Sequence, residues 1–167
     1  MRTVLMVGAF AAAVLVAATV FRGAAAEKAS PEIQATRFVL TDLHGKARAR
    51  LGTGPDGSVA LSLADARGVA RASLSVGADG LSRLALHGAD GRPRIQVTAG
   101  PDDWPSMVFF DKGGQRRAAL DVGIGGWPAF ALADDRGDDR AVLQVAPDGT
   151  PVLVLFDKTG RVIWKTP

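Results

Sequence analysis

The sequence predicts an all-β fold of 23-residue β-hairpin repeats, with about twelve short antiparallel strands in six units after an N-terminal apolar segment. Two observations support this prediction: an aspartate recurs every 23 residues, and a glycine follows each of these positions by three. A fixed period of this size is typical of repeat proteins, whose units bury their apolar surface against neighbouring units. The aspartates are Asp42, Asp65, Asp111, Asp134 and Asp157, with Gly88 at the remaining position, and the glycines are Gly45, Gly68, Gly91, Gly114, Gly137 and Gly160.

An uncharged segment precedes the repeats. From Thr3 to Phe21 there are 19 residues without a charged side chain, and a helix of that length matches the ~30 Å hydrocarbon core of a membrane. Residues 1–22 are therefore predicted to be a signal anchor or a signal peptide cleaved near Ala26, with a buried soluble helix as a third interpretation. The first two interpretations export the remainder. We expect a membrane-anchored protein with its β domain in the periplasm or at the cell surface, or a secreted protein after cleavage.

The remaining chain divides into a linker, residues 23–36, and a β-repeat domain, residues 37–167. In each unit, two columns of large apolar residues lie two positions apart, which is the period of a half-buried strand. The first strand is predicted at Arg37–Thr41. The two columns are Phe38, Leu61, Leu84, Met107, Phe130 and Leu153, and Leu40, Leu63, Leu86, Phe109, Leu132 and Leu155.

A second strand in each unit follows the Asp-x-x-Gly turn and also alternates. An arginine column interrupts its apolar columns and is expected to face away from them. A second turn, such as Gly54–Gly57, closes the unit, and its last glycine accepts the left-handed conformation of a β-bulge. The apolar columns are Ala49, Ala72, Ile95, Ala118 and Ala141, and Leu51, Leu74, Val97, Leu120 and Leu143; the arginines are Arg48, Arg71, Arg94, Arg117 and Arg140.

The turn lengths predict strand pairings that keep the apolar columns on one face. The second turn pairs Leu51 with Leu61 and Ala49 with Leu63, and the Asp-x-x-Gly turn pairs Phe38 with Ala49. A long apolar face is unstable in water. The sheet is therefore expected to close into a barrel, fold into two layers or pair with another chain.

A two-sided parallel β-solenoid, with one unit per rung, is the alternative architecture. Identical unit lengths favour it, because rungs must stack. The charges disfavour it, because the arginines and the turn aspartates would each stack at about 4.8 Å, and like charges directly opposite one another are destabilising. The hairpin arrangement places equivalent positions two strands apart and is preferred.

The charge distribution does not indicate nucleic-acid binding. The net charge is +3, but without Arg2 and Arg22, which flank the apolar segment, 18 basic residues face 17 acidic ones. These charges are well mixed, whereas a nucleic-acid surface needs a clustered basic face. The chain has no cysteine, which excludes disulfides and thiolate metal sites.

No motif in the sequence predicts catalysis, a cofactor or a metal ion. Nearly all carboxylates fall in turns, and none lies in an apolar strand context that would raise its pKa. We therefore predict a non-enzymatic scaffold or binding protein of the cell envelope. The rival interpretations are an envelope glycan hydrolase with paired carboxylates and a secreted carbohydrate-binding module.

Three features are candidates for binding. The regularly spaced arginine column could bind anions or acidic glycans. Trp104 and Trp127 each precede a proline at equivalent positions and could stack on sugars or peptides, whereas Trp164 is expected to cover the end of the core. The outward-facing columns become apolar in the last three units, at Val108, Phe110, Ala119, Ala131, Val142, Val154 and Phe156.

This apolar outer face is the main functional prediction from the sequence. A surface that should be wet and is hydrophobic needs a cover, either another layer of the chain or a partner. We expect the C-terminal units to contact a second copy of the chain or an envelope protein there. Val108, Phe110, Val154 and Phe156 are the predicted contact residues.

Overall fold

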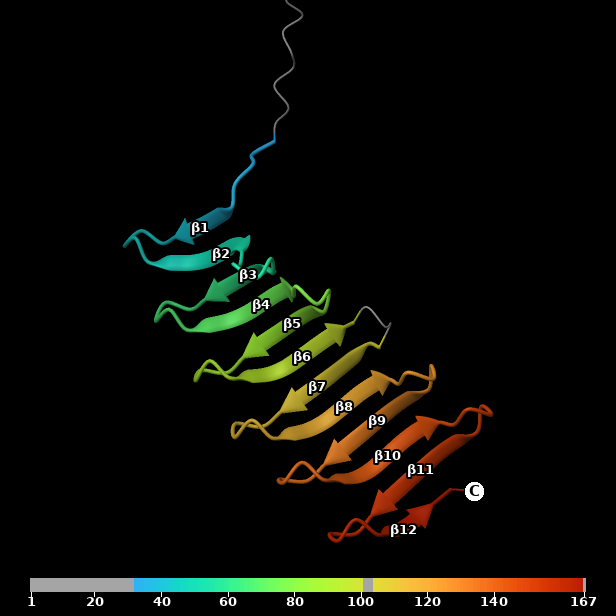
Figure 1. Cartoon of the computed structure of the whole chain (residues 1–167). Coiled ribbons are helices and arrows are strands. Elements are labelled where there is room, and N and C mark those ends of the chain that lie inside the picture. Colours follow the sequence, from blue (N-terminus) through green and yellow to red (C-terminus); the bar gives the residue numbers. More distant parts are fainter. Residues whose placement is uncertain (1–31, 101–103, 167) are drawn as a thin grey trace, which may run out of the picture. The chain divides into compact units, whose positions relative to one another are not determined.

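The computed structural model describes residues 32–100 and 104–166, and within them every regular element is a strand. Twelve strands form one sheet in which each strand pairs with the next, and all pairs are antiparallel (Figure 1). The predicted all-β hairpin architecture is confirmed, and the parallel solenoid is wrong. The strands are β1 (Arg37–Thr41), β2 (Ala47–Thr53), β3 (Val59–Ala64), β4 (Ala70–Val76), β5 (Ser82–His87), β6 (Pro93–Ala99), β7 (Ser106–Phe110), β8 (Arg116–Val122), β9 (Pro128–Ala133), β10 (Asp139–Val145), β11 (Pro151–Phe156) and β12 (Val162–Lys165).

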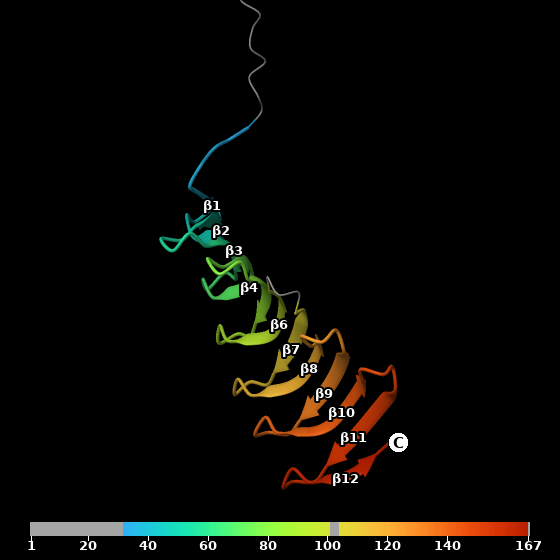
Figure 2. The same cartoon turned by 45° about the vertical axis from the view of Figure 1, so that its right-hand side comes forward.

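The sheet is open and one layer thick in the part of the chain that the structure describes. Strand contacts run only between consecutive strands, and β1 and β12 form the two edges (Figures 1 and 2). These residues thus form neither a barrel nor a two-layered core. No helix among them has the length and apolar character to cross a bilayer. The predicted anchor in residues 1–22 lies outside the described residues.

The Asp-x-x-Gly turns close the hairpins at one end of the strands, so that all of these turns lie along the same side of the sheet. In the first of them, the amide of Gly45 donates to the carbonyl oxygen of Asp42 at 2.9 Å, and the amide of Asp42 donates to the carbonyl of Lys46 at 2.9 Å. Gly45 has φ = 77°, a conformation that glycine adopts without the steric cost that a Cβ imposes. Equivalent turns recur between the later odd and even strands, with positive φ at Gly68, Gly91, Gly114, Gly137 and Gly160.

One predicted register is wrong. The pairing of Leu51 with Leu61 and of Ala49 with Leu63 is confirmed, but Phe38 lies opposite Leu51 and not opposite Ala49. The turn closes between Asp42 and Lys46, and a β-bulge then inserts one extra residue, Arg48, in β2. Together, these two features shift the pairing by two residues from the predicted register. Because side chains alternate between faces with a period of two, the apolar columns still share one face.

One face of the sheet, which we call the leucine face, consists of two cross-strand ladders. The first has a large apolar residue on every strand from β1 to β11, and the second alternates large and small residues over its first four strands and again towards its end. The first ladder is Phe38, Leu51, Leu61, Leu74, Leu84, Val97, Met107, Leu120, Phe130, Leu143 and Leu153. The second is Leu40, Ala49, Leu63, Ala72, Leu86, Ile95, Phe109, Ala118, Leu132, Ala141, Leu155 and Trp164.

The opposite face, which we call the alanine face, carries smaller side chains. Its central ladder is polar on β2, β3, β4 and β6 and apolar from β7 to β11. This ladder is Val39, Arg50, Ser62, Ser73, Ala85, Gln96, Val108, Ala119, Ala131, Val142, Val154 and Lys165.

The positive-φ glycines predict a local stability difference within one turn. Gly126 has φ = 81° and Gly123 does not lie in this region, and a Cβ at either position meets no close contact. Gly126→Ala should lower the free energy of unfolding by about 1 kcal/mol through backbone strain alone. Chemical denaturation measures this change. Gly123→Ala is the matched control, and an equal loss in both variants would contradict the assignment.

Candidate functional site

The leucine face is the most exposed apolar surface of the described residues. Leu74, Leu120 and Leu143 lie on its first ladder with 52%, 50% and 52% of their surface exposed. Cross-strand neighbours cover the sides of each side chain, but nothing in the described residues covers its end. A typical soluble monomer exposes contiguous apolar patches of no more than about 300–600 Å². The leucine face extends across all twelve strands and therefore has the character of a contact surface.

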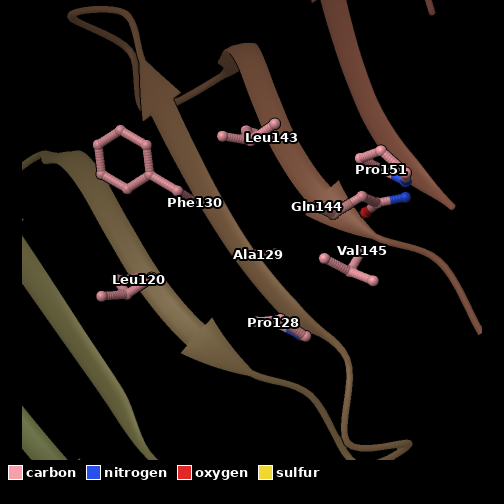
Figure 3. Close-up of a pocket in the computed structure, with 8 residues that line it drawn as sticks. All are labelled: Leu120, Pro128, Ala129, Phe130, Leu143, Gln144, Val145 and Pro151. Carbon is pink, nitrogen blue, oxygen red and sulfur yellow. The ribbon is translucent and has the colours of Figure 1, made fainter. Parts of the chain in front are cut away.

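Shallow apolar grooves run between the side chains of this face. One of about 360 Å³ crosses β8 to β11, and Figure 3 shows Leu120, Phe130 and Leu143 on three neighbouring strands beside it. A second, of about 210 Å³, lies at β3 to β5 around Ala72. Both grooves are lined almost entirely by apolar atoms. They offer hollows for apolar side chains and expose almost no polar surface with which to orient a small hydrophilic ligand, although Gln144 and Ser73 are among their lining residues.

The alanine face is more buried than the sequence analysis predicted. Ala119 and Ala131 are 6% and 8% exposed, because small side chains there lie low between their neighbours. The predicted contact residues Val108, Phe110, Val154 and Phe156 lie on this face and are all half-buried within their own sheet. The sequence thus identified the residues of each face correctly but not the face that is more exposed.

A groove of about 550 Å³ crosses β6 to β8 on the alanine face, with Trp104 at one end. Trp104 is 50% exposed. Polar side chains line the same groove: Asp79, Thr98, Ser106, Arg116 and Asp121. The Thr98 and Ser106 hydroxyls are 2.7 Å apart and hydrogen-bond to each other. An aromatic surface beside carboxylate, guanidinium and hydroxyl groups can stack on one side of a hydroxylated ligand and hydrogen-bond to it on the other.

The other two tryptophans lie in different surroundings. The Trp127 ring lies over Gly125 within its own turn, so close that a Cβ on that glycine would collide with the ring. Trp164 is on the last strand, β12, opposite Leu155 on the leucine face, with 47% of its surface exposed. The expectation that Trp164 closes the end of a core is wrong for the described residues, because the sheet they form is open there.

The turn aspartates hold the Asp-x-x-Gly turns in shape by accepting hydrogen bonds from backbone amides of the same turn. Asp42 Oδ1 accepts hydrogen bonds from the amides of His44 and Lys46, both at 3.0 Å. The same pair of bonds recurs in the later turns, except in the unit that has Gly88 in place of the aspartate, where Asp90 accepts one amide hydrogen bond, from Arg92. These carboxylates therefore satisfy backbone amides that the tight turn would otherwise leave unbonded.

The predicted arginine column lies at the β-bulges, and intramolecular partners occupy its guanidinium groups. Arg48 pairs with Asp42 at 3.7 Å, and its Nε donates to the carbonyl of Ala64 in the next hairpin at 3.0 Å. Arg117 repeats this with Asp111 and Ala133, and Arg71, Arg94 and Arg140 also pair with an aspartate of their own turn. Each bridge to a carbonyl links one turn to the next unit. The anion-binding prediction is untested and stays a prediction.

Sequence reasoning did not identify these bridges, because the bulge that positions the arginines depends on the turn register. One signal was available: each arginine follows its turn aspartate by six residues, except in the unit where Asp90 stands closer. Within residues 32–100 and 104–166, no group of three or more histidine or acidic side chains could hold a metal ion. The turn carboxylates already accept bonds from amides and guanidinium groups.

No protein-family model and no curated protein matches the chain. Among solved structures, the TCP domain of Drosophila melanogaster SAS-4 (dCPAP), in complex with a proline-rich motif of Ana2 (dSTIL), is 13% identical with a TM-score of 0.23, covering 83% of this chain and 96% of that domain. The TCP10 domain of Danio rerio CPAP, in complex with a peptide of Danio rerio STIL, is 14% identical with a TM-score of 0.19, covering 78% and 98%. Superpositions this poor carry no functional information.

The turn at Asp134 predicts a specific acid response. Desolvation raises the pKa of Asp134, but hydrogen bonds from the Arg136 amide and the Arg140 guanidinium outweigh it and lower this pKa to about 2. The ionised carboxylate therefore stabilises the fold above its unfolded pKa near 4, and this contribution is lost as the pH falls towards 2. Asp134→Asn should flatten the decline of unfolding free energy between about pH 4 and pH 2.

Urea denaturation at several acidic pH values measures this slope. Asp135→Asn, at the exposed neighbouring position, is the matched control and should retain the wild-type slope. If the two variants gave the same acid profile, the stabilising role of the ionised Asp134 would be wrong.

Proposed function

We propose that this chain is a non-enzymatic scaffold or binding protein of the cell envelope that acts through protein–protein contact or self-association. The apolar segment from Thr3 to Phe21 supports a membrane anchor with the β domain outside the cytoplasm, and cleavage near Ala26 is the alternative that would release the domain. Protein sequencing of the mature N-terminus distinguishes an anchored protein from a secreted one.

The single observation that carries the proposed contact function is the exposure of the leucine face. Two ladders of apolar side chains cross the sheet without a covering layer among the described residues. Water contact with such a surface is costly, at about 25 cal/mol per Å² of apolar area. A contact that removes this surface from water gains that free energy, and this is the driving force of most stable protein interfaces.

The carboxylates favour a scaffold over a glycan hydrolase. A hydrolase of the usual type needs one carboxyl group that stays protonated near neutral pH, which requires a raised pKa. Here the turn hydrogen bonds act in the opposite direction, and they lower the pKa of Asp65, Asp111, Asp134 and Asp157. These groups are suited to holding turns and not to donating a proton.

Two adjacent phenylalanines on β7 provide a direct test of the contact function. Phe109 lies on the leucine face and Phe110 on the alanine face. Phe109→Ser should reduce the cross-linked fraction of the full-length chain in intact cells, because truncating an interface aromatic can cost about 2 kcal/mol, or roughly 30-fold in affinity. Denaturing gels after chemical cross-linking measure that fraction.

Phe110→Ser is the matched control, with the same change one residue away. If it alone lost the cross-links, the contact would lie on the alanine face, where the sequence predicted it. If both variants kept the wild-type pattern, or no cross-linked species formed at all, the proposed contact function would be wrong.

The Trp104 groove supports a second candidate function, glycan binding. It combines an exposed indole with the carboxylates of Asp79 and Asp121 and the hydroxyls of Thr98 and Ser106. Sugar rings present apolar C–H surfaces that stack on an aromatic ring, and hydroxyl groups that hydrogen-bond to polar side chains. This function is compatible with the first, because the groove lies on the alanine face.

Trp104→Ala should weaken the binding of N-acetylglucosamine oligosaccharides by roughly fivefold to tenfold, since an aromatic contact contributes about 1 kcal/mol. Titration calorimetry of the full-length chain measures the affinity. Trp127→Ala removes an indole from the equivalent turn of another unit and should leave the affinity unchanged. No binding by the wild-type chain, or equal losses in both variants, would contradict a glycan site at this groove.

A further inference from the structure

We propose that the leucine face packs against the leucine face of a second copy of this chain, forming a symmetric sandwich of two twelve-stranded sheets. This inference rests on the proposed contact function and names its partner. In such a dimer, the two-fold axis lies between the sheets, and the same ladders meet from both sides. Three properties of the face support a second copy: its area, its relief and its chemistry.

The area of the face fits a stable dimer. Eleven spacings of about 4.8 Å give a sheet about 53 Å wide, and strands of four to seven residues are about 14–24 Å long. One face thus covers on the order of 1,000 Å². A stable interface of standard size buries about 800 Å² on each partner. Any other partner would need an apolar surface of the same unusual length, which a second copy has by construction.

The relief of the face is suited to contact with its own copy. Large residues repeat on every second strand at the start of the second ladder, at Leu40, Leu63 and Leu86, with the small residues Ala49 and Ala72 on the two strands between them. The groove around Ala72 is one of the resulting hollows. Because large and small positions alternate over β1 to β5 and again over β7 to β11, the large side chains of one sheet can enter the hollows of another. Interdigitation of this kind fills the space between the layers of a β-sandwich, which lie about 10 Å apart.

The chemistry of the face favours a symmetric partner over a charged one. Neither ladder contains a charged residue. The arginines and aspartates lie at the Asp-x-x-Gly turns, at one end of the strands, where they pair with each other. An acidic or basic partner would find no complement on the leucine face, whereas an identical uncharged face leaves no charge buried without a partner.

The centre of the sheet offers the decisive position for cross-linking. Val97 lies on the first ladder in β6, at the middle of the leucine face, and its neighbour Gln96 lies on the alanine face. A two-fold axis through the middle of a face-to-face dimer brings the two copies of Val97 close together. It keeps the two copies of Gln96 apart on the outer surfaces of the sandwich. The chain has no native cysteine, and so a single introduced thiol reports on one position only.

The experiment compares Val97→Cys with Gln96→Cys in the full-length chain. Two versions carrying different affinity tags are expressed together and treated in intact cells with a short bifunctional maleimide. We expect Val97→Cys to give a product of twice the chain mass that carries both tags, and Gln96→Cys to give none. Because neither change introduces a charge or a large side chain, both variants should keep the fold, and circular dichroism of the purified chains checks this.

The other outcomes separate this inference from the proposed function. A Val97→Cys product of different mass with only one tag would mean that another protein covers the face; this overturns the second copy and leaves the contact function intact. A product from Gln96→Cys alone would move the dimer to the alanine face. If Val97→Cys gave no product and reacted freely with a water-soluble maleimide, the face would be uncovered, and both proposals would be wrong. Dimers joined through the edge strands would also overturn the sandwich, because β6 lies about 25–30 Å from either edge.

Discussion

Backbone pairing between consecutive strands is the interaction on which everything else in this structure depends. The described residues form a single layer, and so each strand is held by its two neighbours and by the turns that join it to them. Turn geometry therefore has an unusually large effect, because a shift of one residue in any hairpin would move its apolar side chains to the other face. The glycines with positive φ and the aspartate hydrogen bonds fix each turn, and the pairing register follows from them.

The sequence predicted the hairpins well because their determinants are local. Alternating apolar residues and turn residues act within a few positions of each other, so that the strand Arg37–Thr41 and the pairing of Leu51 with Leu61 could be predicted from spacing. The pairing of Phe38 could not, because the bulge at Arg48 has no composition signal of its own. Its physical reason became visible only in the structure, where the bulged arginine reaches a carbonyl of the next hairpin.

Site prediction was less complete, because exposure is a property of the whole sheet. Residue spacing shows which side chains share a face, but it does not show which face another layer covers. The sequence pattern suggested that the leucine ladders form the core and that Phe110 and Phe156 form the surface. In the structure, large side chains on the leucine face remain half exposed, while small ones such as Ala119 on the other face are nearly buried. The groove beside Trp104 likewise required residues from three strands to be placed together.

The two faces together suggest why the charges lie where they do. A single sheet with apolar side chains on both faces and two free edges is exposed to indiscriminate association. The arginine and aspartate pairs lie at the Asp-x-x-Gly turns. Any face-to-face assembly leaves these turns in water, so the pairs add solubility without interfering with packing. The last strand, β12, is only four residues long and ends at Lys165, which limits strand addition at that end. Because strand addition at β12 is limited and the Asp-x-x-Gly turns are charged, the uncharged leucine face is better suited to association than either of them.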